Sequence, residues 1–311
     1  MGLLSGSLSR RHFCLCCMTG AAFPATGGWL SPRQAFAEAR GLVTLIKDSA
    51  ASSPVTSYKL RGNVSVLEGS GGNIAVLTGP DGKVLIDGGI SVSRPQLTKT
   101  LSSLGAEPIT HLINTHWHFD HTSGNEWLHS VGAEIIAHSN TRKHLNFLPL
   151  PAGAIPTEVL SANRKLTLNG ASIELKPYQP AHTDSDLSVS FTEPDILHTG
   201  DTYWNGVYPF IDYSTGGSID GMIAASDANL AALADSTIII PGHGKPVSNK
   251  SELTAFRDML VDIRDKVAAL KKAGRTLPET VAATPTADHD AKWGQFVIDP
   301  AFFTKLVYEG V

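Results

Sequence analysis

Residues 114–125 read Asn114-Thr115-His116-Trp117-His118-Phe119-Asp120-His121-Thr122-Ser123-Gly124-Asn125, directly after the largely apolar run Ile109–Ile113. Three histidines and one aspartate fall within six of these positions, at 116, 118, 120 and 121. Neutral imidazoles and carboxylates are the side chains that bind borderline divalent metal ions. One ion cannot easily take all four from so short a loop, because each backbone step restricts where the next side chain points. Two neighbouring ions could, with His116 and His118 serving one and Asp120 and His121 the other.

Three later segments each place a metal-binding type of residue where a predicted strand ends. They are Gln179–Asp184 with His182, His198–Thr202 with Asp201, and Ile240–Gly244 with His243. Loops at strand ends are where open sheets present their chemistry, and a glycine beside Asp201 and His243 lets the backbone turn tightly. A lone histidine in such a place is more often packed in the core or on the surface. The three segments gain weight together, because they follow the denser cluster at 116–121.

The cluster and the three later segments resemble the HxHxDH signature and the ligand order of the metallo-β-lactamase superfamily of hydrolases. The match runs from about Tyr58 to Gly244. The resemblance implies an α/β fold, a four-layer αββα sandwich with two sheets face to face. It also implies one metal ion held by His116, His118 and His182, a second held by Asp120, His121 and His243, and Asp201 as the bridge between them. Two zinc ions are the expected cofactors, with iron or manganese as alternatives.

Asp87, which ends the predicted strand 83–87, is expected in a supporting role. A carboxylate commonly orients a ligating imidazole, and similar hydrolases have an aspartate at this point. The remaining candidates are expected not to bind metal, because they lie in predicted strands or lack neighbouring ligands: His111, His129, His138, His144, His198 and His289.

The charge of such a centre points to hydrolysis. Two divalent cations, the carboxylates of Asp120 and Asp201 and a bridging hydroxide leave a net charge of roughly +1, and such a centre lowers the pKa of bound water from about 15.7 to near 7. The expected reaction is attack by metal-bound hydroxide, with Asp120 positioning the attacking water. The expected substrate is a small polar or anionic ester, thioester, lactone or lactam. Its predicted contacts are Tyr203, Trp204, Asn205 and Tyr208.

Several functions remain open at this stage. A ligating Asp201 and a ligand set without thiols resemble glyoxalase II, lactonases and related hydrolases more closely than lactamases that use a cysteine ligand. A periplasmic β-lactamase proper is one alternative, and a single-iron enzyme similar to sulfur dioxygenases is another, because imidazole and carboxylate also accept iron. A non-catalytic binding protein on a decayed scaffold is disfavoured, because decay removes ligands and all seven are present.

The N-terminus has the layout of an export signal. Arg10, Arg11 and Phe13 precede a weakly apolar stretch, and Ala35-Phe36-Ala37 offers a small-x-small cleavage site. Residues 1–37 resemble a twin-arginine signal, and their apolar run is shorter than the roughly 20 residues that a membrane span needs. We therefore expect a periplasmic or secreted protein without a membrane anchor. All three cysteines lie in this segment, so the mature chain would contain no thiol.

The rest of the chain divides into a linker at 38–57, a hydrolase domain at 58–274 and a C-terminal extension at 275–311. Within the domain we expect hairpins over 58–87, helices at 93–104, 124–130 and 251–273, and strands at 109–114, 133–137, 166–168, 172–177, 187–191, 196–199 and 237–240. Residues 146–160 are expected to form a loop over the site. Phe302, Phe303 and Tyr308 make the extension too aromatic for a free tail, so it packs on the domain or on a second subunit in a homodimer.

Composition excludes one class of partner. The formal net charge is −4 and there is no long basic run, which argues against nucleic-acid binding. With 42% hydrophobic and 17% charged residues the chain is globular, and a small-molecule substrate is the expected partner.

Overall fold

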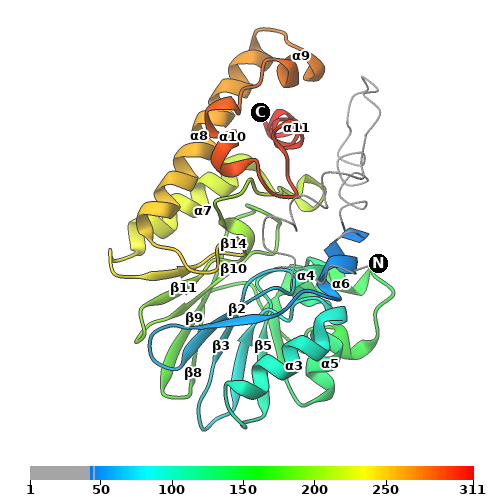
Figure 1. Ribbon diagram of the computed structural model, residues 1–311, viewed down its shortest axis with the longest axis vertical. Helices are drawn as coiled ribbons and strands as arrows, with labels where there is room; N and C mark the ends of the chain where they lie inside the picture. Colours follow the sequence, from blue (N-terminus) through cyan, green and yellow to red (C-terminus); the bar gives the residue numbers. More distant parts are fainter. Residues whose placement is uncertain (1–42, 45) are drawn as a thin grey trace, which may run out of the picture.

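The computed structural model describes residues 43–44 and 46–311, in which two large sheets lie face to face between outer layers of helices (Figure 1). The expected export signal at 1–37, its three cysteines and residues 38–42 and 45 of the expected linker lie outside the described residues. Residues 46–50 are helical and the first strand begins at Thr56, so much of the stretch expected to be a linker has regular structure.

The first sheet contains seven strands in chain order. They are β1 (Thr56–Lys59), β2 (Val64–Glu68), β3 (Ile74–Leu77), β4 (Lys83–Ile86), β5 (Ile109–Ile113), β6 (Glu134–His138) and β7 (Glu158–Leu160). The first four pair antiparallel through short turns, whereas β4 to β7 are parallel. Parallel neighbours need crossover connections. These are made by α3 (Arg94–Ser103), α5 (Asn125–Ser130) and α6 (Ser139–Asn146).

The second sheet has five strands in the order β13-β11-β10-β9-β8. Their bounds are β8 (Arg164–Leu168), β9 (Ala171–Pro177), β10 (Leu187–Phe191), β11 (Ile196–His198) and β13 (Ile238–Ile240). Four of them form an antiparallel meander, and β11 pairs parallel with β13 after a crossover through α7 (Ile219–Ala232). A small parallel pair joins β12 (Trp204–Asn205) to β14 (His243–Gly244).

The central strands bury both faces. In β3, Ala75 and Leu77 belong to the core between the two sheets, where Val189 of β10 also lies, while Ile74 and Val76 belong to the core beneath α3 and α5. Successive side chains of a strand point to opposite faces, so one apolar strand can serve both cores. The four-layer αββα sandwich implied by the sequence is confirmed.

The outer face of the second sheet is covered by the helices that follow residue 218. The helices are α7, α8 (Lys250–Lys272), α9 (Leu277–Ala282), α10 (Ala287–Trp293) and α11 (Pro300–Gly310). Trp293, Phe302 and Phe303 share one buried cluster with Phe256 of α8 and Met222 of α7. Residues 275–311 therefore pack on the layer formed by α7 and α8 (Figure 1).

The helix expected at 251–273 corresponds to α8, and its apolar stripe is core. Asn249 caps its first turn by accepting from the Glu252 amide, and Leu253, Leu260 and Ile263 are fully buried. Several helices of the described residues were not expected, and α6 and α7 show why. In α7, small and apolar residues occur on every side, which leaves little periodicity to read, and α6 is polar over most of its length. Among the described residues, no helix is both long and apolar enough to cross a membrane.

Leu260→Ala is expected to destabilise the protein by about 2–5 kcal/mol, because it leaves a cavity in a fully buried position. Thermal unfolding followed by circular dichroism measures the loss. Val131→Ala provides the control: Val131 is 48% exposed, so its change should stay within about 0.5 kcal/mol. An equal loss in both variants would contradict the burial described above.

Candidate metal centre

Strand ends from both sheets bring the predicted ligands to one place. His116 and His118 follow β5, and Asp120 and His121 lie on the short helix α4 (Phe119–Thr122). From the second sheet, His182 comes from the loop after β9, Asp201 from the turn after β11, and His243 from β14 just after β13. The Leu187 amide of β10 donates to the Thr115 carbonyl at 2.8 Å, which fixes the two sheets against each other at this edge.

All seven predicted ligands fall into two groups whose ligand atoms lie within 4.8 Å of one another. The first group contains His116, His118, His182 and Asp201, and the second contains Asp120, His121 and His243. Below they are called the first and second metal groups. In the first group, His182 Nε2 lies 2.9 Å from His118 Nδ1 and 3.4 Å from Asp201 Oδ2.

The second group adjoins the same Asp201 carboxylate. His243 Nε2 lies 3.1 Å from Asp120 Oδ2 and 3.2 Å from Asp201 Oδ2. His121 Nε2 lies 3.5 Å from Asp120 Oδ2 and 3.1 Å from Asp201 Oδ1. Asp201 thus touches histidines of both groups with its two oxygens, the place that a bridging carboxylate would occupy.

The outward-facing ring nitrogens are held by acceptors, and this determines where the lone pairs point. His121 Nδ1 faces Asp87 Oδ2 at 2.8 Å, His118 Nε2 faces Asp212 Oδ2 at 3.0 Å, and His182 Nδ1 faces the Phe210 carbonyl at 2.8 Å. Carboxylates and carbonyls only accept, so these nitrogens carry the protons and the opposite nitrogens carry lone pairs.

His116 is oriented indirectly by the same Asp87. The Thr115 hydroxyl donates to Asp87 Oδ2 at 2.8 Å, which uses its one proton. It therefore accepts from His116 Nδ1, 3.1 Å away, and leaves the lone pair on His116 Nε2. Asp87 Oδ1 also accepts from the Thr115 amide at 2.7 Å. The predicted supporting residue thus contacts one ligand in each group, directly or through Thr115.

The inner atoms fit a bound cation. His118 Nδ1 and His182 Nε2 face each other at 2.9 Å with two lone pairs and no proton to share. His116 Nε2 and Asp201 Oδ1 are buried and have no hydrogen-bond partner. Buried polar atoms normally have one. A divalent ion in each group would satisfy these atoms, and imidazole with carboxylate is a donor set that such ions accept.

The electrostatics of the two groups differ. Burial lowers the pKa of His182 to about 4, and burial together with neighbouring histidines lowers the pKa of His116. In the second group burial acts in the same sense, but Asp201 and Asp120 outweigh it and raise the pKa of His243 to about 9. Burial is likewise outweighed at Asp120, where His121 and His243 lower the pKa to about 2. The second group therefore favours positive charge among its ligands.

The expected substrate wall needs correction. Tyr203 is fully buried, with its hydroxyl 2.8 Å from Ser248 Oγ and its ring against Phe256. Tyr208 is fully buried as well and stacks on Phe303 at 4.5 Å. Both rings point into the helical core, so neither lines the site.

The other two residues expected to contact the substrate differ in their position relative to the metal centre. Asn205 is buried, and its side-chain amide donates to the Val247 carbonyl and to Glu252. Its NH₂ group is therefore already engaged, and at 4% exposure the side chain offers little surface to a substrate. Trp204 does adjoin the centre: its ring centroid lies 4.2 Å from that of His243. At 5% exposure it packs behind the ligand.

Besides the Thr115 hydroxyl, two contributors were missed from the sequence, the Asp212 carboxylate and the Phe210 carbonyl. Asp212 also accepts from Ser214 and Thr215 and is 1% exposed. Burial opposes its ionisation, but the hydrogen bond from His118 outweighs it and holds the pKa of Asp212 far below its usual value. The segment has no strand end to mark it. The one available signal was an aspartate directly after an apolar run, and a backbone carbonyl has no sequence signal.

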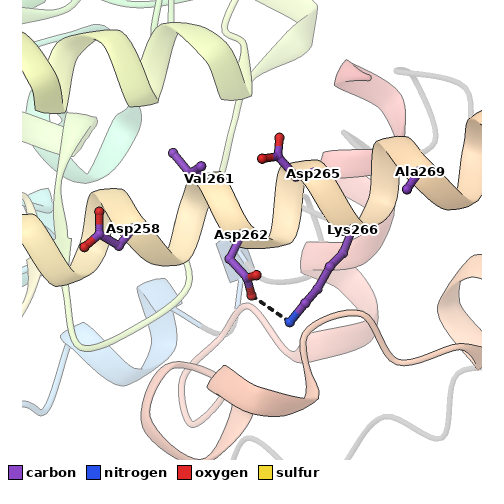
Figure 2. A pocket seen from close by; sticks show the side chains of 6 residues that line it. All are labelled: Asp258, Val261, Asp262, Asp265, Lys266 and Ala269. Atoms are coloured by element: carbon purple, nitrogen blue, oxygen red, sulfur yellow. Dashed lines mark ion pairs between the residues drawn. The ribbon is translucent and has the colours of Figure 1, made fainter.

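A pocket on α8 offers no competing metal site (Figure 2). Its three carboxylates are already paired with cations on the same helix. Asp262 pairs with Lys266 at 2.7 Å, and Asp258 and Asp265 pair with the arginines that precede them. We interpret it as a solvated ion-pair surface, because exposed pairs of this kind are common.

Comparison with known proteins agrees with this geometry. A family model described as the metallo-beta-lactamase superfamily matches residues 67–268. The chain belongs to the metallo-beta-lactamase superfamily.

Curated relatives include two proteins named hydroxyacylglutathione hydrolase. The one from Polaromonas sp. is 30% identical over 153 residues, which cover 48% of this chain and 54% of the relative. The one from Rhodospirillum rubrum is 29% identical over 182 residues, which cover 55% and 63%. The chain thus matches between about half and two thirds of the length of these relatives.

Solved structures agree in fold. The sec-alkylsulfatase Pisa1 from Pseudomonas sp. has a TM-score of 0.65 at 18% identity, covering 82% of this chain and 50% of that one. A metallo-beta-lactamase from Pontibacter korlensis has a TM-score of 0.58 at 18% identity, covering 67% and 99%. At these identities the likeness concerns the fold alone.

Asp87→Asn is expected to weaken divalent metal binding by about 10–100-fold, because partners of this kind tune ligand orientation and basicity. The amide can present its NH₂ group to His121 Nδ1 or to the Thr115 amide, where only an acceptor fits. Competition titration with a chromogenic chelator measures the change. Glu126→Gln, at an exposed position on α5, is the matched control. Unchanged affinity in Asp87→Asn would contradict the role given to Asp87.

Proposed function

We propose that this protein is a metal-dependent hydrolase with two zinc ions, acting on a small polar or anionic thioester or ester. The observation that carries the proposal is Asp201, whose two oxygens lie 3.1 Å from His121 Nε2 and 3.2 Å from His243 Nε2, with His182 Nε2 at 3.4 Å. A carboxylate in this position could offset part of the charge of two cations at once. The relatives named hydroxyacylglutathione hydrolase support a thioester as the first substrate class to test.

The ligands divide into an enclosed and an accessible set. His116, His121, His182 and Asp201 have side chains at most 2% exposed, whereas those of His118, Asp120 and His243 are 11–15% exposed. A substrate would therefore approach from the side of His118, Asp120 and His243. A bound cation there supplies a lowered pKa for water and stabilises negative charge on the reacting carbonyl oxygen.

This chain's own residues would align the reaction. Asp120 holds its Oδ2 near His121 and His243 and stays ionised, because these histidines lower its pKa to about 2. It can therefore accept a hydrogen bond from the attacking water and orient it. Asp87, Asp212 and the Phe210 carbonyl keep the imidazole lone pairs directed inward.

Two aromatic rings beside the accessible ligands are better candidates for substrate contacts than the residues expected from the sequence. Trp117 lies 4.8 Å and Phe210 6.1 Å from the His118 ring, centroid to centroid, and both residues are partly exposed. We propose that they contact the apolar part of the substrate. Phe147, 79% exposed just after α6, lies on the loop that was expected to overhang the site.

The sequence-based expectations of export, of a homodimer and of no nucleic-acid partner stay predictions. They are compatible with a hydrolase of small molecules, and none of them is needed for the chemistry above.

Purified protein is expected to contain close to two zinc ions per chain and to hydrolyse an acyl-glutathione thioester. A chelator should abolish the activity and added zinc should restore it, because the cations supply the main electrostatic stabilisation. Parallel assays with esters, lactones, nitrocefin and sulfate esters define the substrate class. One iron per chain with oxygen uptake on a persulfide would instead identify a sulfur dioxygenase. If none of these substrates is hydrolysed in a chelator-sensitive reaction, the proposal is refuted.

Trp117→Ala is expected to raise KM several-fold for a substrate with an apolar acyl group while metal content stays unchanged. The indole contributes surface at the accessible edge and donates no metal ligand. Steady-state kinetics with a short and a long acyl chain measure the effect. An equal increase in KM for the substrates with short and long acyl chains, or a loss of bound metal, would show that Trp117 supports the metal groups instead.

A further inference from the structure

Residues 208–212, called the linking segment below, lie directly behind the first metal group. The Phe210 carbonyl accepts from His182 Nδ1 at 2.8 Å, and Asp212 Oδ2 accepts from His118 Nε2 at 3.0 Å. The Asp212 amide also donates to the His182 carbonyl at 2.9 Å. Two of the three histidines of the first group thus take their orientation from this segment, and His182 takes its backbone position from it too.

The other side of the linking segment rests on the C-terminal helices. The Tyr208 amide donates to the Trp293 carbonyl at 2.8 Å, and the Tyr208 hydroxyl donates to Asp290 Oδ1 at 2.9 Å. The Tyr208 ring stacks on Phe303 with centroids 4.5 Å apart and an interplanar angle of 11°. Asp290 and Trp293 belong to α10, and Phe303 belongs to α11.

Two further contacts join this part of the chain to α11. Phe210 stacks with Phe302 of α11 at 6.4 Å. Gly310, at the end of α11, lies so close to the Tyr213 ring that a side chain there would collide with it. The linking segment has no regular secondary structure of its own. Its position is therefore set by what it packs against.

The second metal group is supported differently. His121 is held by Asp87, directly after β4, and His243 lies on β14 with its ring against Trp204 of β12. Asp87 follows a strand of the first sheet, whereas Trp204 shares the buried cluster that contains Trp293 and Phe302. No hydrogen bond described above joins Asp87 or Trp204 to α10 or α11, so the second group lacks the direct link that the linking segment gives the first. Both C-terminal helices also lie beyond residues 67–268, the part that the family model matches.

We propose that α10 and α11 act through the linking segment as a positioning element for the first metal group alone. Loss of their contacts with Tyr208 and Phe210 would move the acceptors of His118 and His182, so the cation in that group would bind more weakly, while a cation held by Asp120, His121 and His243 would be spared. The inference rests on the proposed function only in requiring that both groups bind metal.

The test is a stepwise cobalt titration of the full chain, followed by the visible absorption of cobalt and by chelator competition. His243→Ala removes a ligand of the second group and Asp212→Asn disturbs the first, so together they assign the two binding steps. Phe303→Ala is expected to weaken the first-group step by about 10–100-fold, the range for lost orienting partners, and to leave the other step within about twofold.

A milder variant and a matched control accompany it. Tyr208→Phe keeps the stacked ring and removes the hydroxyl bond to Asp290, and should weaken the first-group step several-fold. Leu306→Ala, fully buried on the same helix but with no ring to stack on Tyr208, should lower Tm and leave both steps unchanged.

The outcomes separate the two proposals. If the unsubstituted chain binds no cation, the proposed function fails and this inference fails with it. If it binds two and Tyr208→Phe and Phe303→Ala leave both steps unchanged, only this inference fails. Equal weakening of both steps would show general loosening of the fold and would also overturn it. The same selective weakening in Leu306→Ala would show that the effect does not depend on the contacts of Tyr208, and would overturn the inference as well.

Discussion

The buried carboxylate of Asp87 is the contact on which the centre most depends. One side chain, with no exposed surface, accepts from His121, from the Thr115 hydroxyl and from the Thr115 amide. It thereby fixes the ring of one ligand in each metal group and the start of the loop that carries both. Asp87 itself has a φ of +70°, an uncommon conformation for a residue other than glycine. Strain of that kind persists where surrounding contacts hold it, and it gathers at functional sites.

The two metal groups both adjoin Asp201, but their ligands come from different parts of the chain and are held by different contacts. Short sequence separation brings Asp120 and His121 together, and their support lies in the first sheet. His182 arrives from the second sheet, and its acceptor is a backbone carbonyl in an irregular segment. The burial that lowers the pKa of His182 keeps its ring neutral, while Asp120 and Asp201 draw positive charge to His243. The centre thus combines a histidine-rich half with a half richer in carboxylate.

The sequence was informative wherever a local pattern and a structural role coincide. The cluster at 116–121 and the strand-end positions of His182, Asp201 and His243 predicted seven residues that the structure brings together. The three- and four-residue spacing of apolar residues predicted the helix α8, and these apolar residues are mostly buried in the core. The prediction that Tyr203 and Tyr208 contact the substrate was wrong, because aromatic residues near a ligand in the sequence do not tell which way their rings point. Both turn towards Phe256 and Phe303, residues far along the chain. Asp212 was missed for a related reason, since its role exists only once the chain has folded back on His118.

The origin of the ligands has a consequence for how the protein holds together. His116, His118, Asp120 and His121 leave the edge of one sheet, and His182, Asp201 and His243 leave the edge of the other. A cation bound between them is a cross-link between two halves of the sandwich. Its free energy of binding becomes free energy of folding, about 4 kcal/mol when the free ion exceeds its Kd a thousandfold. Release of metal and separation of the sheets are therefore coupled events, and the loaded protein should exchange its ions slowly.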